Sequence, residues 1–126
     1  MKTTLITGGL GFIGSNICDS LLQKKYTNKC ILLDNFGGYM NPIKDSFIDF
    51  RKQRFPSLKN IIIERCDTSN YKALSSIINK YKPNYIYHTA ALPLAKVSNL
   101  NNEEAKISSV DSTVNIIDAI NLLKNS

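Results

Sequence analysis

The chain of 126 residues is 43% hydrophobic and 21% charged, a composition that argues against wholesale disorder and favours one folded domain over residues 1–126. No apolar run approaches the ~20 residues that a bilayer-spanning helix needs, and the N-terminus lacks the features of a signal peptide, so we expect a cytoplasmic protein without membrane contact. The net charge of +6 comes from basic residues scattered along the chain without interleaved aromatic residues. This distribution argues against a nucleic-acid partner and fits a solvated basic face or an attraction for phosphorylated metabolites.

The first half of the chain alternates strand and helix signals. Residues 3–7 predict a short strand and residues 12–25 a helix. Apolar side chains recur along that helix at helical spacing, as Ile13, Ile17, Leu21 and Leu22. Residues 30–34 and 60–66 are continuous apolar runs, which are typical of strands buried on both faces.

The second half continues the alternation. Residues 70–81 predict a helix, and a fourth strand over 84–91 follows Pro83, whose missing N–H and fixed φ suit the start of a strand. A long helix is predicted over 103–124, with no Gly or Pro inside it. Its apolar residues at helical spacing are Ile107, Val110, Val114 and Ile117.

Strand–helix alternation with short connections predicts parallel strands joined by right-handed crossovers. We therefore expect the α/β class, with a Rossmann-type three-layer fold, a parallel sheet of about four strands in the order 3-2-1-4, and a chain that stops before a fifth strand. An inserted segment over residues 35–59 separates the second and third strands. It predicts either a surface helix over the sheet edge or a lid beside a substrate.

Three glycines, Gly8, Gly11 and Gly14, lie between the first strand and the first helix at intervals of three residues. Gly8 can take a tight turn, Gly11 lets the backbone approach a pyrophosphate, and Gly14 lets the helix pack closely on the sheet. The first N–H groups of the helix, around Phe12 and Ile13, lack internal acceptors and form an anion site. The motif predicts a site for the pyrophosphate of a dinucleotide.

Asp34 ends the second strand, at the distance beyond the glycines where a carboxylate can accept both hydroxyls of an adenosine ribose. It would repel a 2′-phosphate, and we expect no following arginine to neutralise one. The position therefore favours NAD over NADP. Asn35 belongs to the same predicted cofactor site, and the alternative for the pair is a helix or turn cap.

Four segments in this order, TGGLGFIGSNICDSLL, LLDNF, CDTSNY and HTAAL, resemble the extended short-chain dehydrogenase/reductase family. Within it the resemblance is to the NAD-dependent nucleotide-sugar epimerases and dehydratases, and it covers nearly the whole chain. It implies a Rossmann-type fold, NAD as the cofactor and a nucleotide sugar as the substrate of the complete enzyme. The inserted segment is similar to long loops of some UDP-hexose and UDP-uronate 4-epimerases.

The resemblance also assigns cofactor contacts after the third and fourth strands. Asp67 would bond the adenine amino group, with the Thr68 backbone nearby, and Ala90 and Ala91 would line the path of the pyrophosphate and the nicotinamide ribose. The alternative for Asp67 is the N-cap of the following helix.

The last helix departs from the family's pattern. Where the family reads N-V-x-G-T-x-N, this chain reads SVDSTVN, so Ser109 and Ser112 replace the asparagine and the glycine while Asn115 remains. The cofactor contact credited to that first asparagine therefore does not carry over to this chain.

Catalysis in this family is attributed to Tyr-x-x-x-Lys on the helix after the fifth strand. None of the six tyrosines here is followed by lysine four positions later, so we expect no catalytic residue in the chain. Two hypotheses follow: the NAD-binding N-terminal part of a nucleotide-sugar epimerase or dehydratase, which needs its missing half to take substrate, or a stand-alone, inactive NAD-binding or assembly module. The uncovered edge of strand 84–91 and the apolar helix 103–124 predict self-association.

The cysteines and the histidine predict no metal site and no disulfide framework. Cys18, Cys30 and Cys66 are odd in number and far apart, and His88 is the only histidine. We expect the cysteines to be small buried hydrophobic residues and His88 to be a packed, hydrogen-bonded residue rather than a catalyst.

Overall fold

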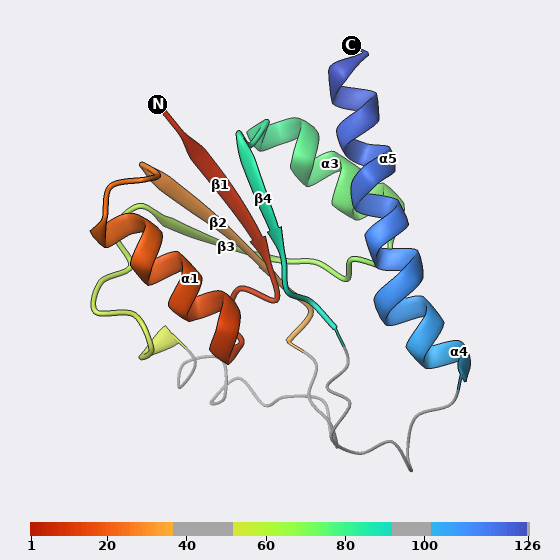
Figure 1. Cartoon of the computed structure of the whole chain (residues 1–126), viewed down its shortest axis with the longest axis horizontal. Helices are drawn as coiled ribbons and strands as arrows, with labels where there is room; N and C mark the ends of the chain where they lie inside the picture. The colour runs from red at the N-terminus through yellow and green to blue at the C-terminus, as the bar shows by residue number, and fades with distance from the viewer. Residues whose placement is uncertain (37–51, 92–101, 126) are drawn as a thin grey trace.

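The computed structural model describes residues 1–36, 52–91 and 102–125, and its strands and helices alternate as expected (Figure 1). In chain order the elements are β1 Thr3–Thr7, α1 Phe12–Gln23, β2 Lys29–Asp34, β3 Ile61–Arg65, α3 Tyr71–Tyr81, β4 Tyr85–His88, α4 Asn102–Ala105, the π-helical segment η2 Lys106–Asp111, and α5 Ser112–Lys124. The predicted ends agree within a few residues, the largest difference being β4, which ends at His88 rather than residue 91.

The described strands form one parallel sheet in the order β3-β2-β1-β4, which confirms the predicted topology. Helix α1 covers one face of the sheet, and α3 and α5 cover the other, so the fold has three layers (Figure 1). The strand order reverses between β1 and β4, the place where open α/β sheets bind their ligands at the carboxyl ends of the strands.

Two hydrophobic clusters occupy the two faces because successive strand residues point to opposite sides. On β1, Leu5 packs towards α3 and α5 while Ile6 packs towards α1. The cluster under α3 and α5 contains Leu5, Ile31, Leu33, Cys66, Leu74, Ile78, Ile116 and Ala119. The cluster under α1 contains Ile6, Leu10, Cys18, Cys30, Leu32 and Phe55. The buried cysteines confirm their prediction as core residues, and all three are free thiols.

The outer strands are less buried than the sequence indicated. The run over 60–66 predicted a strand buried on both faces, but β3 is half-buried along Ile61–Glu64. Strand β4 alternates exposed and half-buried residues. Both differences follow from their places at the two edges of the described sheet, where one neighbouring strand is missing.

Helix α1 differs from its predicted apolar stripe at both ends. Ile13 is 64% exposed, and the buried residues of the helix are Gly14, Ser15 and Cys18. The helix ends at Gln23, because Lys25 takes a left-handed φ of 58° and turns the chain towards β2. Ile17, Leu21 and Leu22 pack on the core as expected.

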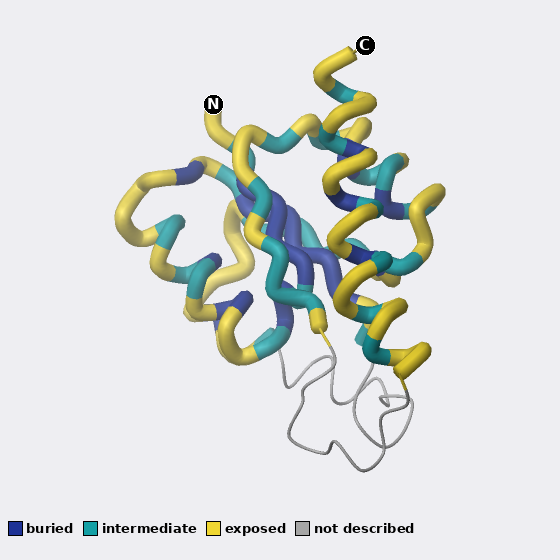
Figure 2. The backbone as a smooth tube through the Cα atoms, turned by 45° about the vertical axis from the view of Figure 1, so that its right-hand side comes forward, coloured by how far each residue is buried: buried dark blue, intermediate teal, exposed yellow. Residues whose placement is uncertain are grey.

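The last helix carries two apolar faces, of which one is buried. Ser112, Ile116 and Ala119 pack towards the sheet. The opposite stripe, made of Ile107, Val110, Val114 and Ile117, is 39–54% exposed (Figure 2). The predicted long helix over 103–124 is present, but its hydrogen bonds take π-helical register over Lys106–Asp111.

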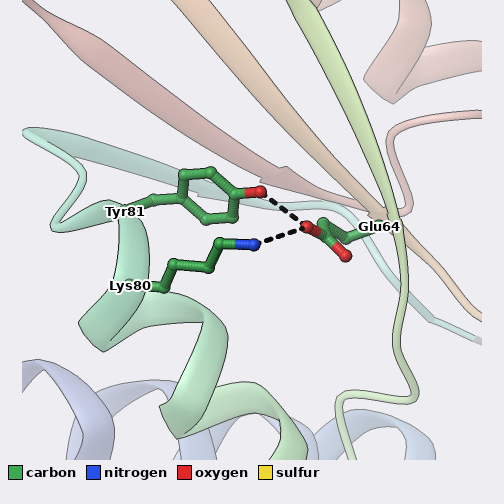
Figure 3. A network of polar contacts seen from close by, with 3 residues as sticks. All are labelled: Glu64, Lys80 and Tyr81. Carbon is green, nitrogen blue, oxygen red and sulfur yellow. Dashed lines mark hydrogen bonds and ion pairs between the residues drawn. The ribbon is translucent and has the colours of Figure 1, made fainter.

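The start and end of α3 are fixed by side chains. Asn70 caps the N-terminus, its Oδ1 accepting the N–H of Ala73 at 3.1 Å. At the other end the Tyr81 hydroxyl donates to Glu64 Oε1 at 2.6 Å, and Lys80 Nζ lies 3.6 Å from the same oxygen (Figure 3). Glu64 and burial together raise the Tyr81 pKa, so the hydroxyl keeps its proton and ties α3 to β3.

Most of the inserted segment lies outside the described residues, so the surface-helix and lid interpretations of residues 35–59 stay predictions. Within its described part, Phe55 is buried in the cluster under α1. Among the described helices none is both long and apolar enough to span a bilayer.

Candidate functional site

The glycine turn between β1 and α1 is packed too closely for side chains. Gly8 takes a φ of 64°, and a Cβ there would lie 2.9 Å from the Ala90 nitrogen. A Cβ on Gly14 would collide with the Gly8 carbonyl oxygen, which confirms the close packing expected there. Gly9, which the sequence did not single out, is equally restricted, because a Cβ would lie 2.7 Å from Leu32 Cβ.

The first turn of α1 is open at its positive end. Gly11 is the N-cap, it supplies no side-chain cap, and no acidic residue lies in the first turn. The N–H groups of Phe12 and Ile13 have no intrahelical acceptor, and these residues are 76% and 64% exposed. A helix end with this geometry can receive an anion.

Asp34 lies beside this turn and takes the turn-cap role that the sequence offered as its alternative, while its role towards a ribose stays a prediction. Its side chain is 8% exposed. Oδ2 accepts the Leu10 N–H at 3.2 Å, which holds the glycine turn, and Oδ1 accepts the Phe36 N–H at 2.9 Å, which forms a local turn. Asn35, the next residue, is exposed. The carboxylate therefore fixes the backbone around the position predicted for an adenosine ribose.

Two arginines that the sequence did not connect with Asp34 lie around the same turn. Arg54 Nη1 donates to the Leu10 carbonyl at 3.2 Å. Arg65, the register partner of Asp34, places its guanidinium 5.6 Å from the centre of the Phe36 ring. The sequence could not reveal these neighbours, because each contact joins residues that are far apart along the chain.

Asp67 and Thr68 follow β3 in different environments. Asp67 is exposed, and its Oδ1 accepts the Ser69 N–H at 2.9 Å and the Ser69 hydroxyl at 2.8 Å. Thr68 is buried, and its carbonyl accepts Asn115 Nδ2 at 3.0 Å. The N-cap alternative for Asp67 is wrong, because Asn70 caps α3.

The segment after β4 is drawn close to the glycine turn by Thr7. The Thr7 hydroxyl oxygen accepts the N–H groups of Thr89 at 3.1 Å and Ala90 at 3.2 Å. In return, Thr89 Oγ1 donates to the Thr7 carbonyl at 2.6 Å. Ala90 is half-buried beside Gly8, and Ala91 is exposed.

The predicted residues thus form an arc along the carboxyl ends of the strands. Gly8 contacts the Ala90 segment on one side, and Asp34 contacts the turn on the other. The Asp67 segment joins the arc through the Cys66 N–H, which donates to the Asp34 carbonyl at 3.0 Å. In the described ranges no three His, Cys, Asp or Glu residues gather to hold a metal ion.

His88 and the cysteines are packed rather than presented to this arc. His88 is half-buried between Thr7 and Ser112, and burial lowers its pKa. Burial also raises the pKa of the Cys66 thiol to about 11, and interaction with Cys30 and burial raise the pKa of Cys18. Cys18 and Cys66 are therefore not reactive thiolates near neutral pH. The hydrogen bond with Cys18 lowers the pKa of buried Cys30.

A parallel sheet with a glycine turn at its switch point and an acid after the second strand defines a Rossmann-type dinucleotide-binding fold. The family described as GDP-mannose 4,6 dehydratase matches residues 5–126. The chain therefore belongs to the GDP-mannose 4,6 dehydratase family.

The matched relatives are longer than this chain. The probable polysaccharide biosynthesis protein EpsC of Bacillus subtilis (strain 168) is 30% identical over 123 residues, which are 96% of this chain and 19% of that protein. The UDP-glucose 4-epimerase of Thermus thermophilus, solved in complex with NAD, has a TM-score of 0.70 at 24% identity, covering 93% of this chain and 33% of that one. The Stenotrophomonas maltophila UDP-glucose-4-epimerase, solved with bound NAD, has a TM-score of 0.73 at 17% identity, covering 96% and 34%. The chain thus spans about a third of these solved structures and a fifth of EpsC.

Proposed function

We propose that the chain binds NAD along the carboxyl ends of its strands and supplies the cofactor site of a nucleotide-sugar epimerase or dehydratase. The observation that carries the proposal is the glycine turn, where Gly8 and Gly14 have no room for a Cβ and the open N-terminal end of α1 begins between them, at Phe12. The pyrophosphate binds at the N–H groups of Phe12 and Ile13, with Gly11 allowing its close approach.

The other predicted residues take their places around this anchor. Asp34 and Asn35 receive the adenosine ribose, Asp67 and the Thr68 backbone receive the adenine, and Ala90 and Ala91 line the way to the nicotinamide. The contacts of Leu10, Phe36 and Ser69 with the two carboxylates support this arrangement, because they hold both acids in fixed orientations.

The preference for NAD over NADP rests on Asp34. Its buried carboxylate repels a 2′-phosphate, whereas Arg54 and Arg65 on the surrounding segments would attract one. The preference between NAD and NADP therefore depends on opposing charges, and the negative charge of Asp34 favours NAD.

The reaction assigned to the complete enzyme is epimerisation or dehydration of a nucleotide sugar, an isomerase or lyase activity. NAD supplies hydride chemistry when bound, and the residues of this chain bind and orient it. The acid–base Tyr-x-x-x-Lys pair is absent from these 126 residues, so we expect no turnover of nucleotide sugars by this chain alone. Free, buried cysteines fit the reducing cytoplasm as its location.

Self-association belongs to the same proposal. The stripe Ile107, Val110, Val114 and Ile117 is exposed along η2 and α5. Apolar stripes of this kind mark protein interfaces. We expect a second copy of the chain to cover this stripe. Sedimentation of the wild-type chain and of a Val110→Asp, Val114→Asp double variant would test this expectation. A wild-type chain that stays monomeric at high concentration would contradict it.

A Gly11→Ala variant separates NAD binding from folding. Gly11 has an ordinary φ of −72°, and its Cβ would meet only the Gly8 oxygen at 3.1 Å within 4 Å, so we expect stability within about 1 kcal/mol of wild type. The methyl group lies where the pyrophosphate approaches, so NAD affinity should fall about tenfold or more in calorimetric titration.

Gly14→Ala is the contrasting variant, because its Cβ collides with the Gly8 oxygen and should destabilise the fold itself. Failure of the wild-type chain to bind NAD, or unchanged affinity in Gly11→Ala, would overturn the proposed function.

A further inference from the structure

His88 joins three elements through its two ring nitrogens. It is the last residue of β4 and the register partner of Thr7 at the end of β1. Nδ1 lies 2.6 Å from Thr7 Oγ1, and Nε2 lies 3.3 Å from Ser112 Oγ on the first residue of α5. Thr7 and Ser112 are both fully buried, so water does not compete for these bonds.

The bonds of Ser112 fix the position of the imidazole proton. Ser112 Oγ lies 2.6 Å from the Ser108 carbonyl. A carbonyl can only accept, so the single hydroxyl proton of Ser112 points to Ser108. Towards His88 the hydroxyl must therefore accept, and Nε2 carries the hydrogen.

The bonds of Thr7 lead to the same tautomer. Its hydroxyl oxygen accepts the N–H groups of Thr89 and Ala90, which uses both lone pairs. Its proton is then donated to Nδ1 of His88, which must be unprotonated. Each hydroxyl and ring nitrogen thus has a consistent role only when the imidazole is neutral.

A proton on Nδ1 would break this arrangement. Thr7 Oγ1 could accept it only by releasing the N–H of Thr89, which keeps a second acceptor in the Thr7 carbonyl at 3.2 Å, or the N–H of Ala90. Release of Ala90 loosens the segment beside Gly8. Burial lowers the pKa of His88, in agreement with a site that accepts only the neutral ring. Since the folded-state pKa is the lower one, the unfolded chain binds this proton first, and stability falls as the pH falls below about 6.5.

Among the described residues no neighbouring charge offsets the cost of protonation. Strand β1 carries no titratable side chain, and Tyr85 and Tyr87 of β4 alternate to the other face. Lys106 and Asp111 of η2 pair with each other at 3.9 Å. The remaining titratable groups on α4, α5 and the segment after β3 are Glu103, Glu104, Asp118, Lys124, Cys66 and Asp67. Burial alone lowers the pKa of His88.

We propose that His88 is a positioning residue of the cofactor site, which holds the 89–91 segment against the glycine turn as a neutral imidazole and weakens NAD binding when it is protonated. The inference rests on the proposed function. Ser112 stands where the family's motif has glycine, which has no hydroxyl, so the link from Nε2 through Ser112 to the Ser108 carbonyl of the π-helical segment needs this serine side chain.

The first test reads the imidazole directly. His88 is the only histidine, so the histidine ¹⁵N signals of the full chain belong to it alone. We expect the Nε2–H tautomer at about pH 8 and a pKa below ~6.5. An Nδ1–H tautomer, or a pKa at or above ~6.5, would overturn the inference.

The second test compares NAD affinity with that titration. Wild-type affinity should begin to fall at the measured His88 pKa, by up to about tenfold per pH unit. In His88→Asn the amide oxygen can still accept from Thr7, but the residue does not titrate. We expect this variant to bind NAD within about tenfold of wild type near pH 8 and to lose the fall at lower pH.

Serine variants test the link to α5. Ser112→Ala removes the acceptor of Nε2, and we expect about fivefold weaker NAD binding near pH 8. Ser76→Ala, an exposed serine of α3, is the matched control and should bind as wild type does.

The outcomes separate the inference from the proposed function. An affinity that stays constant across the His88 pKa, or an equal fall in His88→Asn, would show the inference wrong while NAD binding stands. Acid unfolding caused by other titratable groups would produce the same fall in His88→Asn. No NAD binding by the wild-type chain near pH 8 would remove the proposed function, and this inference with it.

Discussion

Asp34 and Asp67 follow neighbouring parallel strands, yet the protein surrounds them differently. Asp34 is 8% exposed and accepts the N–H groups of Leu10 and Phe36. Asp67 is exposed, and its carboxylate accepts from Ser69, two residues further on. The first acid holds the glycine turn, whereas the second holds its own local turn.

These different surroundings predict how much stability and how much NAD affinity the protein should lose when each acid is replaced. Removal of a buried carboxylate leaves its backbone N–H partners without an acceptor. Removal of an exposed carboxylate costs less, because water can accept from the same N–H groups. We therefore expect substitutions at Asp34 to affect both folding and NAD binding, and substitutions at Asp67 to affect binding alone.

The largest effect is expected from Asp34→Arg. The change removes the acceptor of two backbone N–H groups and adds a third cation to Arg54 and Arg65. We expect NAD affinity to fall about 100-fold or more, with a loss of about 2–4 kcal/mol in urea unfolding. Asp118→Arg makes the same charge change at an exposed position of α5 and should alter neither quantity appreciably.

A smaller effect is expected from Asp34→Asn, which removes the charge and keeps the shape. The amide oxygen can replace one of the two carboxylate acceptors, so stability should fall by about 1–2 kcal/mol. NAD should bind about tenfold more weakly, and NADP should gain affinity because Arg54 and Arg65 then meet its phosphate unopposed. Paired NAD and NADP titrations measure both changes; NADP binding that does not improve would contradict the assigned role of the Asp34 charge.

The smallest effect is expected from Asp67→Ala. NAD affinity should fall about three- to tenfold through the loss of one hydrogen bond to adenine, while stability changes by less than about 1 kcal/mol. Titration and urea unfolding of the same preparation separate the two. A stability loss as large as that of Asp34→Asn would erase the distinction between the two acids.

The sequence predicted much of this frame because its signals are local. The alternation of strand and helix signals, with short connections between them, predicted the order β3-β2-β1-β4, which the sheet confirms. The parallel order follows from chain connectivity and the handedness of crossovers, so it does not depend on side-chain detail.

What escaped prediction depends on contacts between distant residues. Arg54 reaches Leu10 across the inserted segment, and Asn115 of α5 reaches the Thr68 carbonyl. The π-helical register also escaped, because Ser112 looks like an ordinary helical residue in the sequence. In the structure its N–H donates to Ile107, five residues back, while its hydroxyl takes the Ser108 carbonyl.

A titration of the wild-type chain with NAD, followed by amide-resolved NMR, shows whether the cofactor binds along the glycine turn. We predict saturable shifts at the N–H groups of the turn and the first helical residues, Leu10 to Ile13, together with Thr68 and Ala90. Shifts along the exposed stripe of η2 and α5 should be small. A titration without saturable shifts, or one whose shifts spare Leu10 to Ile13, would contradict this prediction.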